Sequence, residues 1–489
     1  MENKSLLDEI TNIASRRGFF FQTAEIYPDN NSGFLEYGPY GVELKNKIIS
    51  QWRKLILKKD NMLEIDGSQI LPPSVFIASG HLKNFTDPLV YCEKCKNKFR
   101  ADKIIEDATK HPMAENLANE EYDKIIEKNK IMCPKCKSRL SKTLRWNLMF
   151  KTGVGAEEKD SYLRPETCQS IFLNFPRLSK IMRMKLPIGI AQVGKSFRNE
   201  ISPRQGILRM REFTQAEVEV FFNPKKENDV SIEKIENETL IFFFENKTHE
   251  IAIKNAIRKK LISSKLIAYY LFLLQNFYLH IGFPKEKIRF RKLNDDEKAF
   301  YAKEAFDFEV LTSIDWVELV ACNHRGDYDL SGHQKNSREK MEILDESTNS
   351  KVLPNVFELS LGIDRTLYSL MDLGYEDDKK NERTIFKFNP KIAPIQVAIF
   401  PLLNKDKLPE KAQEVYNSIK DCFDCFYDEA GSIGKRYRRQ DEIGTPFCIT
   451  IDHDTLKDNS VTVRERDNMK QERVKIKELQ TVLWKKIFG

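Results

Sequence analysis

The chain has 489 residues, of which 41% are hydrophobic, and 80 basic against 73 acidic side chains leave a formal net charge of +7. This length predicts about three domains, and the composition excludes disordered and fibrous proteins. The small positive excess permits a nucleic-acid partner without requiring one, since nonspecific polyanion binders usually have a more one-sided charge.

The amino terminus, MENKSLLDEI, lacks the charged and then apolar segments of a signal peptide. The most apolar run, Leu266 to Leu279, is too short to cross a bilayer and contains Gln275 and Asn276, so it predicts a buried helix. The nine cysteines, four of them in two CxxC pairs, indicate an intracellular protein with a metal site rather than a disulfide framework. We therefore expect a cytoplasmic protein without a membrane segment.

The first half of the chain shows four stretches of different character. Residues 1–90 mix helical and strand patterns with turn signals. Residues 91–145 are charged and carry both CxxC pairs, which predicts an insertion. Short strands broken by Gly and Pro follow over 146–222, and residues 223–285, rich in Lys, Glu and Asn before a helical segment, predict a second insertion.

The second half of the chain predicts the end of one domain and the whole of another. Strand patterns resume over 288–320, and residues 355–373 predict a strand followed by a helix. After the Lys/Asn/Pro stretch 387–394, strands alternate with helices over a domain-sized segment. We expect one domain over 1–390, with the two insertions, and a second domain over 391–489.

A charged hairpin is predicted between Ile190 and Phe222, with Ser202–Gly206 as its connecting loop. Because side chains alternate along a strand, one face carries Ala191, Val193, Phe197, Ala216, Val218 and Val220. The other face carries Gln192, Arg198, Glu200, Arg209, Arg211, Phe213, Gln215 and Glu217. This second face is either a solvated array of ion pairs or a site for a ligand with both charges, because arginine binds phosphate and carboxylates hold ammonium groups.

Two motifs in this order resemble those of the class II aminoacyl-tRNA synthetases. FRNE, a loop and R-x-x-E-F, ending at Phe213, are similar to motif 2, and VFELSLGIDRTLYSLM, Val356 to Met371, is similar to motif 3. Further stretches, including GFLEYGPYGVELKNKI, YLRPETCQSIFLNF and GSIGKRYRRQDEIGTPFCITID, resemble the dimeric glycyl-tRNA synthetases. The resemblance covers most of the chain and is weakest over 100–130 and 223–285.

The resemblance implies an α+β class II synthetase core, a mainly antiparallel sheet flanked by helices, followed by a C-terminal α/β anticodon-binding domain. It implies a homodimer, with motif 1 in the segment GVELKNKIISQWRK. The implied reaction joins glycine and ATP into glycyl-adenylate and pyrophosphate, and then transfers the glycyl group to the 3′ end of tRNA(Gly). Such an enzyme needs no protein nucleophile, since catalysis is mainly alignment and neutralisation of negative charge.

Two arginines match the family's catalytic positions: Arg198 would contact the α-phosphate and Arg365 the γ-phosphate. Glu318 and Glu358 match acidic groups near ATP and its Mg²⁺, and Phe213 matches a residue that stacks on adenine. The ATP-binding set implied by the resemblance is Arg198, Asn199, Glu200, Leu208, Arg209, Met210, Arg211, Glu212, Phe213, Glu318, Leu319, Gly362, Ile363, Asp364 and Arg365. The alternative for Arg365 is an ion pair at the start of a helix.

Glycine has no side chain, so a protein must recognise its ammonium group and exclude larger amino acids by lack of space. The glycine-binding set implied by the resemblance is Arg100, Glu166, Phe213, Thr214, Gln215, Ala216, Glu217, Glu358, Leu359, Ser360, Leu361 and Gly362. Taken singly, each of these glutamates is more often a surface charge. Several carboxylates around one ammonium group would distinguish a site from a surface.

The pairs Cys92-x-x-Cys95 and Cys133-x-x-Cys136 have zinc-knuckle spacing, which predicts a structural zinc ion held by four thiolates. The alternative is four reduced thiols on a charged insertion. We expect the zinc to hold the insertion closed and to position Arg100.

The segment KRYRRQDE, Lys435 to Glu442, places cationic and aromatic residues beside a predicted strand. Lys and Arg contacts to phosphate, with base stacking on Tyr, are the usual means of holding a single-stranded RNA loop. The segment therefore predicts contact with tRNA, and a basic surface helix without a ligand is the alternative.

Two other functions stay open at this point. A relative that charges serine, threonine or proline would need a partner for the side chain, and the glutamate set does not supply one. A noncatalytic paralogue that binds nucleic acid would be expected to lack Arg198 or Arg365, and both are present.

Overall fold

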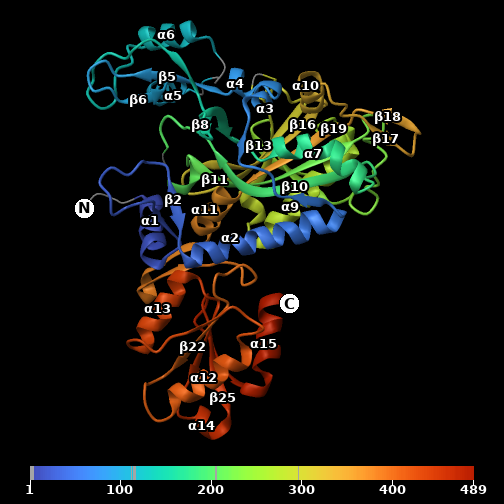
Figure 1. Ribbon diagram of the computed structural model, residues 1–489. Coiled ribbons are helices and arrows are strands. Elements are labelled where there is room, and N and C mark those ends of the chain that lie inside the picture. The colour runs from blue at the N-terminus through green and yellow to red at the C-terminus, as the bar shows by residue number, and fades with distance from the viewer. Residues whose placement is uncertain (1–4, 112, 114–116, 204–205, 296) are drawn as a thin grey trace.

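A nine-stranded sheet forms the centre of the larger part of the molecule (Figure 1). The computed structural model describes residues 5–111, 113, 117–203, 206–295 and 297–489. The strand order is β13-β12-β14-β15-β16-β19-β11-β10-β3, antiparallel except for the pairs β10/β3 and β12/β14. The predicted, mainly antiparallel sheet is confirmed. Its strands are β3 (Leu63–Ile65), β10 (Ile188–Phe197), β11 (Glu212–Phe222), β12 (Thr239–Phe244), β13 (Lys247–Ala252), β14 (Ile288–Lys292), β15 (Glu304–Leu311), β16 (Trp316–Gly326) and β19 (Asn355–Gly362).

The two faces of this sheet are covered differently. On one face, alternate residues such as Val218 and Leu359 join the main hydrophobic core. The helices that pack into this core are α1 (Leu6–Arg17), α2 (Pro39–Trp52), α9 (Lys265–Ile281) and α11 (Ile363–Gly374). On the other face, α7 (Cys168–Ile181) and α10 (Tyr328–Ser337) pack around Phe221 and cover only part of the sheet. The polar face that they leave uncovered forms the candidate site.

The charged hairpin is the pair β10/β11. Gln192 lies opposite Glu217, and Gly194 lies opposite Gln215, so the predicted polar face is confirmed for these strands. The segment that joins the strands includes a short helical turn at Gly206–Leu208. Arg204 and Gln205, within the predicted loop, lie outside the described residues.

The stretch 223–285, expected as an insertion, continues the sheet at its edge. It forms β12 and β13, then α8 (Ile253–Arg258) and α9. Helix α9 begins after Ser264, whose hydroxyl accepts a hydrogen bond from the backbone N–H of Ile267, and ends at Gly282 with a positive φ of 107°. This confirms the predicted buried helix. No helix among the described residues is long and apolar enough to cross a membrane.

The cysteine-bearing stretch lies at the end of the molecule farthest from the C-terminal part (Figure 1). It contains β5 (Thr86–Tyr91), β6 (Lys98–Arg100), α5 (Ala101–Thr109), α6 (Asn119–Lys128) and β7 (Leu144–Asn147). A small separate core includes Val90, Phe99, Ile105 and Tyr122. The segments that lead into and out of it are β4 (Ile70–Leu71), α3 (Pro73–Ala78), α4 (His81–Asn84), β8 (Phe150–Val154) and β9 (Lys159–Leu163).

The C-terminal part has a second core that begins at Val397, whereas Ala393 still belongs to the first. Its sheet has the order β23-β22-β24-β25-β26, and β22 is parallel to both of its neighbours. The predicted alternation of strand and helix is confirmed. The elements are β22 (Val397–Pro401), α12 (Leu408–Ile419), β23 (Cys425–Tyr427), α13 (Ile433–Ile443), β24 (Phe447–Ile451), α14 (Thr455–Asp458), β25 (Ser460–Glu465), β26 (Gln471–Lys475) and α15 (Ile476–Phe488).

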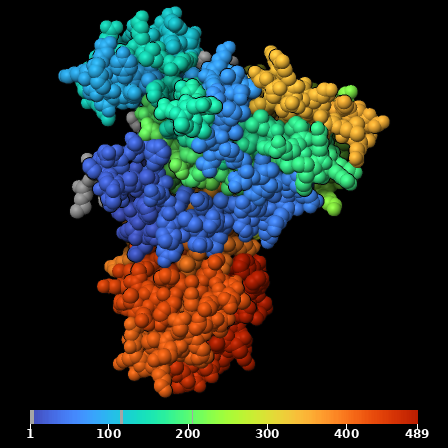
Figure 2. All heavy atoms as spheres, in the orientation of Figure 1, coloured from blue at the N-terminus to red at the C-terminus, as the bar shows by residue number. Residues whose placement is uncertain are grey.

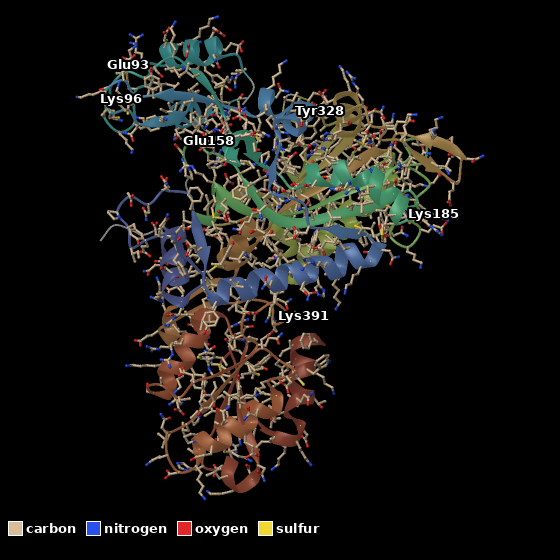
Figure 3. All side chains as sticks on the ribbon, viewed as in Figure 1. Glu93, Lys96, Glu158, Lys185, Tyr328 and Lys391 are labelled. Atoms are coloured by element: carbon tan, nitrogen blue, oxygen red, sulfur yellow. The ribbon has the colours of Figure 1, made fainter. Side chains whose placement is uncertain are left out.

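The two parts meet along one side of the C-terminal block (Figure 2), and Lys391 lies at the junction (Figure 3). Arg17 of α1 donates a 2.5 Å hydrogen bond to Glu442 of α13. Arg383, on β21 (Arg383–Phe386), bonds to Asp441 at 3.1 Å. Because the Arg383 and Asp441 side chains are 5% and 1% exposed, this contact is a buried ion pair.

Candidate active site

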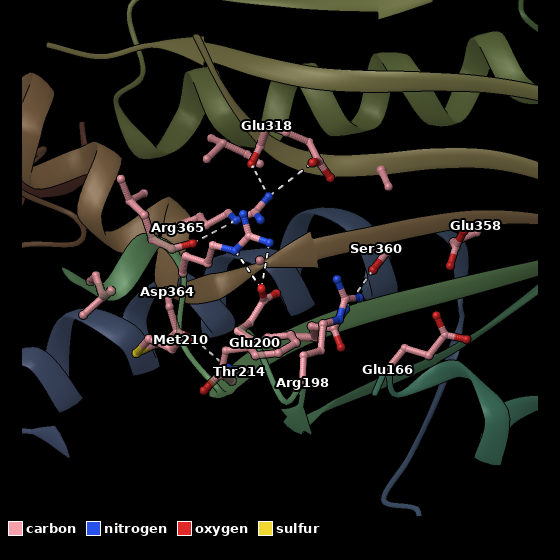
Figure 4. A pocket seen from close by; sticks show the side chains of 18 of the residues that line it. Glu166, Arg198, Glu200, Met210, Thr214, Glu318, Glu358, Ser360, Asp364 and Arg365 are labelled. Carbon is pink, nitrogen blue, oxygen red and sulfur yellow. Dashed lines mark hydrogen bonds and ion pairs between the residues drawn. The ribbon is translucent and has the colours of Figure 1, made fainter. Parts of the chain in front are cut away.

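A cleft of about 810 Å³, including the part that opens to solvent, lies over β11, β16 and β19 (Figure 4). Its lining residues are Glu166, Arg198, Glu200, Ile207, Leu208, Arg209, Met210, Phe213, Thr214, Gln215, Tyr301, Glu318, Leu319, Ala321, Asn323, Glu358, Ser360, Gly362, Asp364 and Arg365. Arg198 and Arg365, which lie 167 positions apart in the sequence, thus line the same cavity.

Strand alternation decides which of the predicted residues face the cleft. On β19, Glu358 and Ser360 line it, whereas the intervening Leu359 and the following Leu361 belong to the apolar core. Ala216 of β11 is likewise a core residue. Of the predicted glycine-binding set, Ala216, Leu359 and Leu361 do not line the cleft, and neither does Ile363 of the predicted ATP-binding set, because these four side chains lie in the apolar core.

Arg198 follows directly after β10, and its guanidinium lies between two aromatic rings. The ring centroids of Phe85 and Phe213 are each 5.3 Å from its Cζ, and its Nε donates to the Pro165 carbonyl at 3.2 Å. Cation–π contacts on both sides orient the guanidinium, and no carboxylate among the described residues forms an ion pair with it. This leaves charged N–H donors available for an anion.

Arg209 is held in place by Glu200. Its Nε and Nη2 lie 2.8 and 2.7 Å from Glu200 Oε2, and Nη2 is 3.9 Å from Asp87 at the base of the cysteine-bearing stretch. The Glu200 side chain is 9% exposed and that of Arg209 is 30% exposed. The pair therefore anchors the carboxylate and leaves part of the guanidinium at the cleft surface.

Arg365 stands at the start of α11. Its Nη1 donates to the carbonyl of Glu318 at 3.0 Å and to the Glu318 carboxylate at 3.2 Å. Its Nε donates to the Leu208 carbonyl at 3.3 Å. An ion pair at the helix start does exist, but both partners are more than a third exposed and line the cleft.

A β-bulge brings Glu318 and Ala321 to the same side of β16. The register of β15 against β16 shifts between Phe308 and Glu309, so that Glu309 pairs with Glu318 and Phe308 with Val320. The extra residue reverses the alternation beyond it. Plain alternation would therefore have placed Glu318 and Ala321 on opposite faces.

Besides Ile363, three residues of the predicted ATP-binding set do not line the cleft. The backbone N–H of Asn199 donates to the Leu148 carbonyl, and the Asn199 carbonyl accepts a hydrogen bond from the Trp146 indole. Arg211 donates to the carbonyls of Ser32 and Glu200, and Glu212 pairs with Lys195. The backbone of Asn199 and the side chains of Arg211 and Glu212 therefore hold this part of the hairpin through contacts outside the cleft.

Asp364 lines the cleft beside Arg365 and is buried (Figure 4). It accepts hydrogen bonds from the Thr214 backbone N–H at 2.5 Å and from the Tyr37 hydroxyl. Burial raises the pKa of its carboxyl group. Because protein donors already occupy both oxygens, Asp364 joins α11 to β11.

Glu166 enters the cleft from the loop before α7, which Arg164 fixes. Arg164 donates to the carbonyls of Lys195 and Gly67 at 2.8 and 2.9 Å. The Arg164 side chain lies against Gly194. A Cβ added at Gly194 would lie 2.2 Å from Arg164 Nη2, so any other residue at this position would displace the arginine. The RPET segment is thereby held against β10.

Glu166 is surrounded by donors at the buried end of the cleft. His81 Nε2 is 3.2 Å from its Oε1, Arg325 Nη2 is 4.0 Å away, and Cys168 and Gln169 also donate to it. Burial alone would raise the pKa of Glu166, but His81 and Arg325 hold it well below its usual range. Glu166 is therefore an ionised carboxylate.

Glu217 lies below the cleft surface and orients Ser360. Ser360 Oγ donates to Glu217 Oε1 at 2.5 Å, Gln215 Nε2 donates to the same oxygen at 3.1 Å, and Thr167 donates to Oε2. Burial and the neighbouring Glu166 raise the pKa of Glu217. The network presents Ser360 and Gln215, rather than Glu217 itself, to the cavity.

Glu358 is held by two residues of β16 that the sequence analysis missed. Arg325 Nη1 donates to it at 2.9 Å and Asn323 Nδ2 at 2.7 Å. Arg325, 1% exposed, also forms two bonds to Asp329 and lies 3.9 Å from the Tyr301 ring centroid. Ala321, Asn323 and Arg325 occupy alternate positions along the chain, so strand alternation in the sequence could have indicated that they share a face. Among the lining residues, Ile207, Tyr301, Ala321 and Asn323 were not predicted.

Comparison with known proteins places this cleft in a family. The description "tRNA synthetase class II core domain (G, H, P, S and T)" matches residues 150–373, and "Anticodon binding domain" matches residues 396–486. A protein from Methanothermobacter thermautotrophicus is 36% identical, with 97% of this chain and 98% of that protein covered. Proteins from Thermococcus gammatolerans and Pyrococcus furiosus are 38% and 37% identical, and each comparison covers 98% of this chain and 98% or 99% of the other. All three are named "Glycine--tRNA ligase".

The chain belongs to the glycine--tRNA ligase family. It is an aminoacyl-tRNA ligase with a class II synthetase core and a C-terminal anticodon-binding domain, so the predicted fold class and enzyme class are confirmed.

Arg100 does not line the synthetase cleft. It is 8% exposed, and its guanidinium bonds to Asp102 at 2.5 and 3.0 Å and lies 3.1 Å from Asp87. Because Asp87 also faces Arg209, the cysteine-bearing stretch contacts the cleft where Arg209 lies. In this structure Arg100 therefore lies outside the cleft lined by other residues of the predicted glycine-binding set.

The four predicted cysteines form one cluster. Sγ of Cys92 is 3.3 Å from that of Cys136, and Sγ of Cys95 is 3.7 Å from that of Cys133. All four sulfurs lie within 4.8 Å of one another. A zinc ion bound at about 2.3 Å in a tetrahedron separates its sulfur ligands by about 3.8 Å, so the donor set fits this metal.

The segment Lys435–Glu442 of the anticodon-binding domain is largely used inside that domain. Arg436, 2% exposed, donates to the carbonyls of Pro401 and Gly431, and Tyr437 bonds to Thr450. Arg439 pairs with Asp428. Helical spacing turns Lys435 and Arg438 fully outward, so contact of this segment with tRNA stays a prediction that these two side chains could carry.

Proposed function

We propose that this enzyme activates glycine with ATP and transfers the glycyl group to tRNA(Gly). The observation that carries the proposal is the division of one cleft into two ends. Arg365 lies toward one end, with Arg209 bonded to Glu200 nearby. Glu166 and Glu358 lie toward the other end, and Arg198 lies between them (Figure 4). A triphosphate and a small zwitterion would together match both signs of charge.

In the first step, a carboxylate oxygen of glycine attacks the α-phosphorus, and the bond to the bridging oxygen of pyrophosphate breaks. Arg198, which has no carboxylate partner among the described residues, would stabilise the charge that builds up on the α-phosphate. Arg365 and Arg209 would hold the outer phosphates and keep the reacting atoms aligned. The side chains of both arginines are about a third exposed. Glu318, the partner of Arg365, is exposed as well, whereas Glu200, the partner of Arg209, is buried.

Magnesium, when bound with ATP, supplies further neutralisation of the phosphates. Glu318 fits this role because its carboxylate is 44% exposed and lines the cleft beside Arg365. Glu358 fits it less well, since it is buried and bonded to Arg325 and Asn323. We therefore assign Glu318 to the metal side and Glu358 to the amino-acid side.

The buried end of the cleft favours a small amino acid. Glu166 and Glu358 would accept hydrogen bonds from the ammonium group, and Tyr301 closes one wall. The Ser360 hydroxyl, a candidate partner for a substrate hydroxyl, already donates to Glu217. This network argues against the rival assignment to serine or threonine.

We propose that Cys92, Cys95, Cys133 and Cys136 hold a structural Zn²⁺. The stretch around them has a core of few residues, and small domains of this kind commonly depend on a metal. The zinc would keep β5 and β6 together and so hold Asp87 against Arg209.

We further propose that residues 1–390 form the catalytic domain of a cytoplasmic homodimer and that residues 391–489 bind the tRNA anticodon. The two hydrophobic cores on either side of residues 394–396 support this division. Motif 1 would lie on α2, whose segment GVELKNKI follows Pro39.

Amino-acid-dependent exchange of pyrophosphate into ATP, run with all twenty amino acids, tests the proposal. Exchange with glycine alone is expected. Exchange with another amino acid instead would overturn the substrate assignment, and no exchange with any amino acid would favour a nucleic-acid-binding paralogue.

A further inference from the structure

Glu219 is a buried carboxyl group that the proposed mechanism does not use. It follows Glu217 by two positions on β11 and so lies on the same side of the sheet. Glu219 is 0% exposed, and neither of its oxygens has a hydrogen-bond partner among the described residues. Burying an ionised carboxylate without a partner is costly, so its protonation state needs a physical explanation.

Glu219 lies directly opposite Glu358 in the antiparallel pair β11/β19. A carboxylate oxygen of each residue and Sγ of Cys168 lie within 4.8 Å of one another. Two like charges at this separation in a buried place cannot both persist without cations of their own. Glu358 lines the cleft, whereas Glu219 does not.

Acidic groups dominate the surroundings of this pair. The titratable and charged groups that face Glu219 are Glu217 on β11, Glu358 on β19, Arg325 on β16, Asp329 on α10 and Cys168 on α7. The Arg325 guanidinium donates to Glu358 and Asp329 and makes no hydrogen bond to Glu219. The one cation of this group is therefore already shared between two other carboxylates.

Burial and Glu358 raise the pKa of Glu219 well above its usual range, and burial raises the pKa of Glu358 to about 7. Interacting carboxyl groups titrate as a pair rather than singly. The directions of both shifts agree with the geometry, since each group is buried beside the other.

We propose that Glu219 and Glu358 share one proton while the amino-acid pocket is empty and that the ammonium group of glycine displaces this proton to solvent. The inference rests on the proposed function. The ammonium keeps its three protons, so one positive charge replaces another and the pocket stays balanced. Glu219 acts through Glu358 and is a positioning residue rather than a catalytic one.

This exchange links glycine binding to pH. Below the apparent pKa of the pair, glycine must displace a proton, so its KM rises as the pH falls, at most tenfold per pH unit. Above that pKa the pair is already ionised, and the KM becomes independent of pH. A neutral ligand of the same size could not replace the positive charge of the proton, so displacing the proton would not favour its binding.

Calorimetry of glycine binding to the full-length enzyme with a nonreactive ATP analogue measures the proton directly. Titrations at about pH 6.5 in two buffers that differ in ionisation enthalpy give the number of protons released. The wild-type enzyme is expected to release about one proton, and Glu219→Gln close to none, because an amide cannot give up a proton. A wild-type enzyme that releases none, or a variant that releases as many as the wild type, would overturn the proposal.

A matched control and a second variant complete this test. Glu250 lies on the edge strand β13 and pairs with Lys285 at the surface, so the Glu250→Gln enzyme should release as many protons on glycine binding as the wild type. Glu219→Asp keeps a carboxyl group at the position, so this variant should still release a proton on glycine binding, even if Glu219→Gln fails to fold. Loss of proton release in a folded Glu219→Asp enzyme would count against the proposal.

The two levels of inference fail in different ways. Absence of glycine-dependent pyrophosphate exchange would overturn the function, whereas exchange with a pH-independent KM for glycine would overturn only the shared proton.

Discussion

At the proposed phosphate end of the cleft, the arginines are half-buried, and their partners are ring faces, backbone carbonyls, the buried Glu200 and the exposed Glu318. At the amino-acid end, Arg325 and Asp329 are each 1% exposed and Glu358 is 2% exposed, and the network involves only protein groups. The first arrangement lets a large, hydrated anion replace weak contacts at small cost. The second fixes the shape of a small pocket before the substrate arrives, which suits a ligand without a side chain.

Arg325→Met is expected to have the largest effect, because it leaves Asp329 and Glu358 as buried charges without their cation. Removing one partner of such a network costs about 3–5 kcal/mol. The apparent unfolding temperature of the catalytic domain should fall by roughly 10 °C at about 2–4 °C per kcal/mol, as followed by calorimetry.

Arg365→Met is the matched variant at the phosphate end. Its partner Glu318 is 44% exposed, so loss of the pair should lower the unfolding temperature by no more than about 3 °C. Equal shifts for the two variants would contradict the contrast between the two ends.

Arg198→Ala should remove the charge that stabilises the α-phosphate in the transition state. A loss of roughly 10²–10³ in the rate of glycine-dependent pyrophosphate exchange is expected, as for other preorganised donors. Affinity for tRNA should remain, since the side chain lies inside the cleft.

Lys195→Ala, on the same hairpin but paired with Glu212 outside the cleft, should exchange pyrophosphate at nearly the wild-type rate. A parallel loss of tRNA binding in Arg198→Ala would indicate misfolding rather than loss of a catalytic contact.

Ser360→Ala tests the amino-acid end without removing a charge. Loss of its hydrogen bonds with Glu217 and Gln215 should cost about 1–2 kcal/mol, which raises the KM for glycine roughly tenfold while the KM for ATP stays near the wild-type value. Equal rises in both constants would show that the network supports the whole cleft and not the glycine end alone.

Glu318→Gln is expected to have the smallest effect on stability. The exposed pair with Arg365 contributes less than about 1 kcal/mol, so the unfolding temperature should change little and should depend only weakly on salt. A large shift would mean that Glu318 holds the bulge of β16 in place.

Local spacing in the sequence determined the alternating C-terminal domain, the polar face of the hairpin and the four-cysteine cluster, because strand alternation and CxxC turns are short-range features. The mainly antiparallel sheet and the two arginines beside one ATP were implied by the resemblance to class II synthetases. Alternation along the hairpin places Ala216 on the apolar face, whereas only the tertiary structure decided that Leu359 and Leu361 face the core, because a motif names consecutive residues and a strand presents every second one.

The remaining differences arise from contacts between segments far apart in the chain. The bulge opposite Glu309 moves Glu318 to the cleft face, and Asp87 and Asp102 keep Arg100 away from the amino-acid end. Arg325 reaches Glu358 only through the pairing of β16 with β19. Such positions depend on register and on the nearest buried charge, which local sequence patterns do not specify.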